Sequence, residues 1–214
     1  IVAEGYMDVI ALSEAGFNAT VAPLGTAVTE DQLRLMWRMA SEPVIALYGD
    51  KAGIRAAERL IDLALPMIEA GKSLQFVLLP DGKDPDDLLK AGGAGAMQEQ
   101  LDASKPLIDM LWERELHAAP YDTPEQKAGL DQRLRVAVSK IADKSVRAHY
   151  GQAIKDLRWQ TFRPQRGGGS FTPRVRKDGP TTGTRQSALA TTANERALER
   201  LREVLEEGLE ELTV

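Results

Sequence analysis

The order of apolar runs in the first hundred residues is the strongest constraint on the fold. Short segments built almost wholly from Val, Ile, Leu and Ala alternate with longer ones whose apolar residues recur every three or four positions. Runs that are apolar throughout are typical of strands buried on both faces, and the longer period is typical of helices. We therefore predict an α/β fold with a parallel sheet flanked by helices, its strands at 1–3, 19–22, 44–47 and 76–79.

The pattern changes after residue 103. Residues 104–163 show only helical periodicity and predict a small helical subdomain of three helices. Residues 164–193 are rich in Gly, Pro, Thr and Arg and predict a disordered basic linker. Residues 194–214 place leucines among glutamates at helical spacing and predict an acidic amphipathic helix. The predicted domains are therefore 1–103 and 104–163.

The composition narrows the chemistry that the chain could carry. It has no cysteine and two histidines far apart in sequence, which excludes thiolate zinc sites, iron–sulfur clusters and a cysteine nucleophile. A metal site would need oxygen ligands, which favours magnesium, manganese or calcium. No apolar run approaches a membrane span and no signal peptide is visible, so we expect an intracellular, cytoplasmic protein without a membrane partner. Because Ile1 lies inside an apolar run, we also expect a piece of a longer chain, with 194–214 starting a truncated C-terminal region.

Charge is distributed unevenly along the chain. The net charge of −5 combines −7 over residues 1–100 with +2 over 101–163, and +4 over 164–193 with −4 over 194–214. The chain as a whole is therefore no polycation, and any nucleic-acid binding must be local.

Acidic residues follow three of the predicted strands. Glu4 and Asp8 follow the first, Asp50 the third, and a group from Asp81 to Asp87 the fourth. Ligands of open parallel sheets bind at the carboxyl ends of the strands, and clustered carboxylates favour a divalent cation. The group after the fourth strand could instead be a solvent-exposed turn that caps a helix, a reading we prefer for Asp81 and Asp87 and weigh equally for Asp86.

These segments resemble a known family. Glu4-Gly5-Tyr6-Met7-Asp8 looks like the first motif of the TOPRIM domain in bacterial replicative DNA primases. Later motifs of the same family resemble, in order, Leu24-Gly25-Thr26, Gly49-Asp50-Lys51-Ala52-Gly53 and Leu79 to Asp86. The resemblance covers about residues 1–163 and implies a TOPRIM-type sheet followed by the helical part of the RNA polymerase core.

The resemblance implies an activity and a set of partners. The family is a DNA-directed RNA polymerase, a nucleotidyltransferase that makes short RNA primers on single-stranded DNA for replication. It would use Mg²⁺ or Mn²⁺, ribonucleoside triphosphates and, within the primosome, a replicative helicase bound through the truncated C-terminal region. We expect this piece alone to be inactive, because the family's zinc-binding domain and its basic template surface would lie upstream of Ile1.

The resemblance also assigns roles to residues. Glu4 and Asp50 would be catalytic and metal-linked, and the full set of metal ligands would be Glu4, Asp8, Asp50, Asp84 and Asp86. Lys51 and Lys83 stand beside these acids and could hold phosphate, or could equally be solvent-exposed neighbours.

One residue departs from the family pattern. The family motif reads Asp-Gly-Asp, whereas this chain has Tyr48-Gly49-Asp50. A phenol stays protonated at neutral pH and supplies no carboxylate. Two alternatives therefore stay open: a non-catalytic TOPRIM module that binds metal or nucleic acid, weakened by Tyr48, and a TOPRIM nuclease or topoisomerase.

Overall fold

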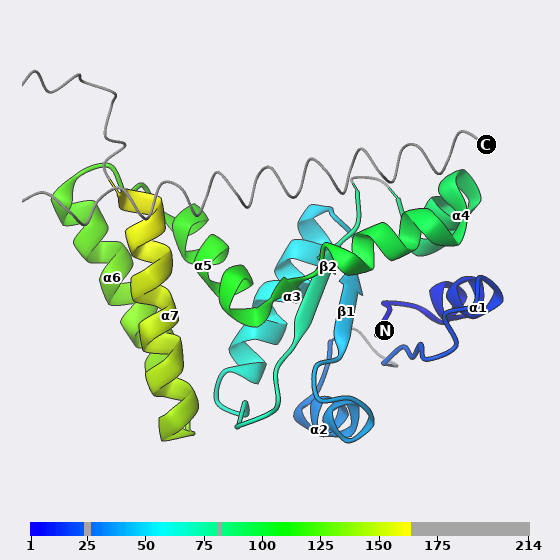
Figure 1. Ribbon diagram of the computed structural model, residues 1–214, viewed down its shortest axis with the longest axis horizontal. Helices are drawn as coiled ribbons and strands as arrows, with labels where there is room; N and C mark the ends of the chain where they lie inside the picture. The colour runs from blue at the N-terminus through cyan, green and yellow to red at the C-terminus, as the bar shows by residue number, and fades with distance from the viewer. Residues whose placement is uncertain (24–26, 81–82, 164–214) are drawn as a thin grey trace, which may run out of the picture. The chain divides into compact units, whose positions relative to one another are not determined.

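A parallel pair of strands forms the centre of the computed structural model, which describes residues 1–23, 27–80 and 83–163 (Figure 1). Strands β1 (Val44–Leu47) and β2 (Gln75–Leu78) pair in register over their whole length. The described residues belong to one compact unit, so the boundary predicted between 103 and 104 stays a prediction. The predicted linker and the predicted acidic helix lie outside the described residues.

The sheet differs from the sequence prediction at both edges. One edge has isolated bridges in place of two predicted strands, and the other has an antiparallel strand that was not predicted. Val2 makes single parallel bridges to Val21 and to Ile45, so the strands expected at 1–3 and 19–22 are reduced to bridging residues with the predicted direction. On the other edge, β3 (Lys105–Pro106) pairs antiparallel with β2. The sheet is therefore parallel at its centre and mixed overall.

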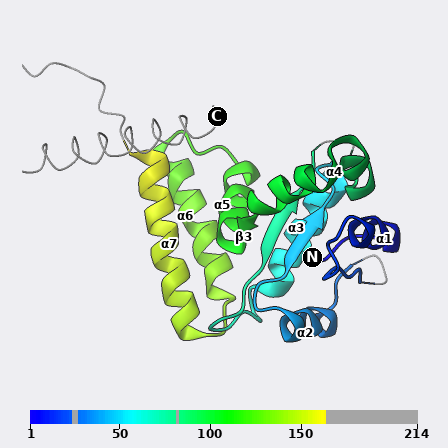
Figure 2. The ribbon, with the colours of Figure 1, turned by 45° about the vertical axis from the view of Figure 1, so that its right-hand side comes forward.

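Helices occupy the connections and the whole of the C-terminal part. They are α1 (Tyr6–Glu14), α2 (Glu30–Met39), α3 (Lys51–Ala64), α4 (Pro85–Asp102), α5 (Leu107–Ala118), α6 (Pro124–Ser139) and α7 (Lys144–Phe162). Figures 1 and 2 show α6 and α7 running side by side in opposite directions, with α5 between them and the sheet. Three helices after residue 104 confirm the helical reading of that part of the chain.

Local sequence explains where the helices that frame the sheet begin and end. Asp50 caps α3 by accepting hydrogen bonds from two backbone amides, and Asp84 caps α4 ahead of Pro85 at the first helical position. Helix α3 ends at Ala64, two residues before Pro66, whose ring could not continue the hydrogen-bond ladder. Helix α4 was not predicted from its apolar pattern, because Gly92, Gly93 and Gly95 interrupt it; Gly93 has a φ of 66° at a kink inside the helix.

The main core joins the sheet to the first of the C-terminal helices. Its completely buried side chains include Leu33 of α2, Ile61 of α3, Phe76 of β2 and Leu111 of α5. Burial of such side chains stabilises the fold by about 1.5–3 kcal/mol each before entropy is counted. Residues of α5 therefore hold the helical part directly on the sheet.

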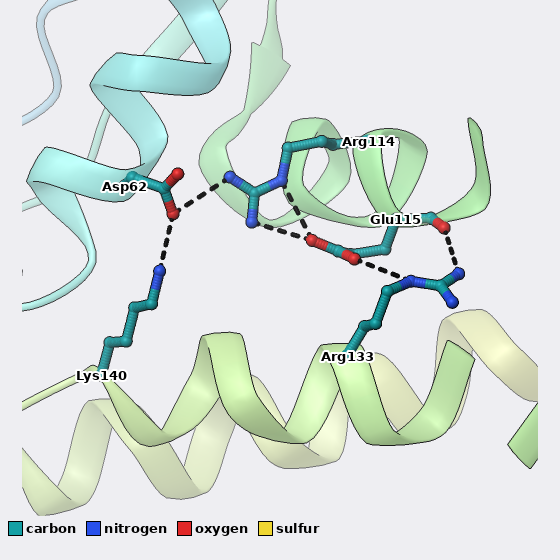
Figure 3. A network of polar contacts seen from close by, with 5 residues as sticks. All are labelled: Asp62, Arg114, Glu115, Arg133 and Lys140. Carbon is teal, nitrogen blue, oxygen red and sulfur yellow. Dashed lines mark hydrogen bonds and ion pairs between the residues drawn. The ribbon is translucent and has the colours of Figure 1, made fainter. Parts of the chain in front are cut away.

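A network of charged side chains reinforces the same junction (Figure 3). Asp62 of α3 accepts a hydrogen bond of 2.9 Å from Lys140 and lies 3.3 Å from Arg114 of α5. Arg114 also contacts Glu115, which is only 8% exposed and bonds Arg133 of α6. The network thus connects three helices. Among the described residues, no helix is both long and apolar enough to cross a membrane.

Candidate active site at the acidic sheet edge

The carboxyl ends of the central strands bring the predicted acidic motifs to one edge of the sheet. Glu4 follows the bridging residue Val2, Asp50 lies between β1 and α3, and Asp84 lies between β2 and α4. Because these strands are parallel neighbours, the three segments leave the sheet on the same side. We call Glu4, Asp8, Asp50, Asp84 and Asp86 the acidic edge.

A hydrogen bond joins the first two motifs. Oε1 of Glu4 accepts from the backbone amide of Tyr48 at 2.9 Å, although the residues are 44 positions apart. The Glu4 side chain is otherwise exposed. It is thus anchored to the end of β1 while it faces solvent.

Asp8 is the buried member of the acidic edge. It lies in the first turn of α1, is only 3% exposed, and its Oδ2 accepts from the Gly5 amide at 3.0 Å. The same oxygen accepts from the hydroxyl of Tyr48 at 3.2 Å. Tyr48 therefore bonds two predicted metal ligands, Asp8 through its hydroxyl and Glu4 through its backbone amide.

The protonation of this pair reflects burial and neighbouring charge. Burial raises the pKa of Asp8; the hydrogen bonds from Gly5 and Tyr48 oppose this, and the charges of Asp84 and Asp86 add to it. The repulsion indicates that acids from separate motifs lie close enough to affect one another. Burial, together with the charge of Asp8, raises the pKa of Tyr48 to about 12, so the phenol is a hydrogen-bond donor at neutral pH.

Asp50 and Asp84 each combine a structural task with their position at the edge. Oδ1 of Asp50 accepts from Ala52 and Gly53 at 2.9 and 2.8 Å, and Oδ1 of Asp84 accepts from Asp87 at 2.7 Å. All three bonds are accepted by Oδ1, so Oδ2 of each carboxylate takes no part in the cap. A cap and an outward-facing oxygen are therefore compatible in both residues.

The first turn of α3 packs tightly against Tyr48. A Cβ added at Gly53 would lie 1.9 Å from the Tyr48 carbonyl oxygen, far inside van der Waals contact. Glycine at this position lets the Asp50 cap approach the end of β1. The sequence marks Gly53 only as part of a motif, and the structure supplies the steric reason.

Asp86 has a partner that the sequence interpretation missed. Its carboxylate forms an ion pair with Lys90 one helical turn further along α4, and this contact raises the pKa of Lys90. The spacing of four residues on a helix is the signal that could have found it. Lys51 and Lys83 are exposed at the start of α3 and just before α4, and neither has an ion pair among the described residues. Whether they hold phosphate stays a prediction.

The donor set matches a hard divalent cation in its chemistry. All five side chains offer carboxylate oxygens, which Mg²⁺ and Mn²⁺ prefer, and a cation would relieve the repulsion that Asp84 and Asp86 exert on Asp8. Within residues 1–23, 27–80 and 83–163, however, no three acidic or histidine side chains lie close enough together to hold one ion. A bound ion would therefore draw these carboxylates closer than they lie here.

Comparison with known proteins agrees with the fold and the motifs. Residues 1–89 match the family model described as Toprim-like. The DNA primase of Rickettsia conorii is 44% identical over 162 residues, which are 76% of this chain and 27% of that protein. The chain therefore spans about a quarter of the length of the curated relative.

Solved structures agree as well. The catalytic core of the Escherichia coli primase superposes with a TM-score of 0.67 at 33% identity, over 73% of this chain and 50% of that one. A DnaG primase catalytic domain bound to single-stranded DNA gives 0.68 at 32% identity, over 73% and 51%. The chain therefore belongs to the bacterial DNA primase family, of which it carries the Toprim-like domain and the helices that follow it.

Proposed function

We propose that the acidic edge is the metal-dependent catalytic part of a primase that synthesises short RNA primers on single-stranded DNA. The observation that carries the proposal is the convergence of Glu4, Asp8 and Asp50 around the end of β1, with Tyr48 bonded to the first two. The primase relatives support it. The nuclease and topoisomerase alternatives, and the purely binding module, have no comparable support.

The residues of this chain would orient the reacting groups. The Glu4 side chain, held by the Tyr48 amide, would present its second oxygen toward solvent, and the Asp50 and Asp84 caps would fix two more carboxylates relative to the sheet. Magnesium or manganese, bound by these acids, would neutralise the triphosphate and favour attack by the primer hydroxyl. Lys51 and Lys83 would contribute positive charge toward phosphate.

The partners of the whole protein are part of the same proposal. Template DNA and ribonucleoside triphosphates would meet at the acidic edge. A replicative helicase would recruit the protein to the primosome in the bacterial cytoplasm.

The test replaces the corresponding segment of the Escherichia coli primase by residues 1–163 of this chain and measures primer synthesis with Mg²⁺. We expect synthesis, weak with Tyr48 and stronger with Tyr48→Asp. The control is Lys72→Gln, a partly exposed position just before β2 and away from the acidic edge, which should leave synthesis unchanged. Loss of synthesis with Glu4→Gln is expected. Absence of primers from both the Tyr48 and the Tyr48→Asp exchange proteins, when each is folded, would refute the proposal.

A further inference from the structure

The two longest C-terminal helices enclose a groove that the acidic edge does not use. It has a volume of about 400 Å³ and lies between one face of α6 and one face of α7. Leu134, Val138 and Ile154 supply its apolar side chains. No role in the proposed chemistry accounts for it.

Cations dominate the polar lining of this groove. Arg135 comes from α6, and Arg147, Lys155 and Arg158 come from α7. Of these four, only Arg158 has an ion pair in the part of the chain described, with Asp131 at 3.0 Å. Three cations on a chain with a net charge of −5 are thus left without an acidic partner.

On the opposite face of α6, the basic side chains do have acidic partners. There Arg133 bonds Glu115, and Lys140 at the end of the helix bonds Asp62 (Figure 3). Basic side chains at the packed junction of the helices are therefore paired with acids, whereas the lining of the groove contains one acidic residue, Asp131. Unpaired cations in a concave surface attract anions more strongly than isolated surface charges do.

Gly151 lies at the middle of the groove, between Arg147 and Lys155 on the same face of α7. A Cβ there would meet nothing within 4 Å, so packing inside the chain does not require glycine. Glycine inside a helix is unfavourable relative to alanine. A glycine that the fold does not need, flanked by cations, suits close approach of a ligand to the helix backbone.

We propose that the α6–α7 groove binds a single strand of nucleic acid, with phosphates on Arg135, Arg147 and Lys155 and with sugars and bases over the apolar floor. Charge complementarity favours this ligand over an acidic protein helix, since the three unpaired cations line the groove from both helices. The choice of nucleic acid rests on the proposed function. The groove itself is separate from the acidic edge.

The test measures binding of the full chain to fluorescein-labelled oligothymidylate by anisotropy at several salt concentrations. Arg147→Gln/Lys155→Gln should weaken binding at low salt on the order of tenfold and reduce the slope of log affinity against log salt by about 1.4. The matched control, Arg34→Gln/Arg38→Gln on α2, removes the same charge and should change both values far less.

A second variant separates the groove from general electrostatics. Gly151→Leu alters no charge, its Cβ would meet no atom within 4 Å, and position 151 lines the groove, so its thermal unfolding should be unchanged or higher while its affinity for the oligonucleotide falls at least severalfold. Equal affinity of Gly151→Leu and the unaltered chain would overturn the proposal. So would a Gly151-dependent affinity for an acidic amphipathic peptide without one for DNA. Neither result depends on metal binding, so failure here is distinguishable from failure of the acidic edge.

Discussion

The hydroxyl of Tyr48 donates a hydrogen bond of 3.2 Å to Oδ2 of Asp8, a carboxylate that is almost entirely buried. The bond places a neutral donor on an oxygen of a predicted metal ligand. The metal affinity of the acidic edge should therefore depend on this one side chain.

Replacing Tyr48 tests that dependence. Tyr48→Asp adds a charged oxygen and should raise the affinity for Mn²⁺ in calorimetry by about tenfold or more, while lowering the stability of the metal-free fold because another negative charge joins Asp8. Tyr48→Phe is the matched control: it removes the hydrogen bond, costs about 1 kcal/mol, and adds no ligand. Equal affinity and stoichiometry in all three proteins would show that position 48 has no part in metal binding.

Substitutions at Asp50 can separate its role in capping α3 from the role of its negative charge in metal binding. Asp50→Asn keeps an oxygen for the Ala52 and Gly53 amides, so its unfolding free energy should change little, while its Mn²⁺ affinity should fall. Asp50→Ala should lose the affinity and also about 1 kcal/mol of stability. Denaturant unfolding and calorimetry on the pair measure the two effects. Full metal affinity in Asp50→Asn would exclude this residue as a ligand.

Gly53 should be the least replaceable glycine of the described motifs. Gly53→Ala forces a methyl group into the Tyr48 carbonyl and should destabilise the fold by roughly 2 kcal/mol or more. Gly151→Ala is the control, because its methyl group has open space and its helix propensity improves by up to about 1 kcal/mol. Similar melting temperatures for both variants would contradict the close approach of α3 to β1.

Asp62 should contribute to acid sensitivity. Although partial burial opposes ionisation, contacts with Lys140 and Arg114 lower the pKa of Asp62 below its usual value. A folded-state pKa below the unfolded one adds stability above about pH 4, which is lost as the pH falls through the folded-state value. Since the side chain is 51% exposed, the contribution should stay below about 1 kcal/mol.

The check is urea unfolding between pH 7 and pH 2.5 with Asp62→Asn alongside the unaltered chain. The variant should be less stable at pH 7, and the gap should close in the acid range. A gap that is constant across this range would mean that Asp62 has the same pKa in both states.

The sequence predicted the parts of this molecule that depend on local pattern. The central strands and the shared edge of Glu4 and Asp50 follow from apolar periodicity and from the direction of parallel strands. Strand β3 could not be predicted, because two residues carry no periodicity and their pairing depends on β2.

Contacts between residues far apart in the sequence could not be predicted either, because local patterns do not show which segments meet. The Tyr48–Asp8 bond joins residues 40 positions apart, and the burial of Glu115 depends on arginines from two helices. The α6–α7 groove likewise exists only once the helices are paired. Patterns in one segment do not contain such information.

Helix α3 has one end in the acidic edge and its other end in the charge network. Its first residue follows Asp50, and Asp62 near its other end holds Arg114 and Lys140 from the helical part. We therefore expect a shift of the C-terminal helices to move α3 as a rigid helix, and with it Asp50, the residue that caps its first turn. The position of Asp50 in the acidic edge should therefore depend on how tightly the helical part packs against the sheet.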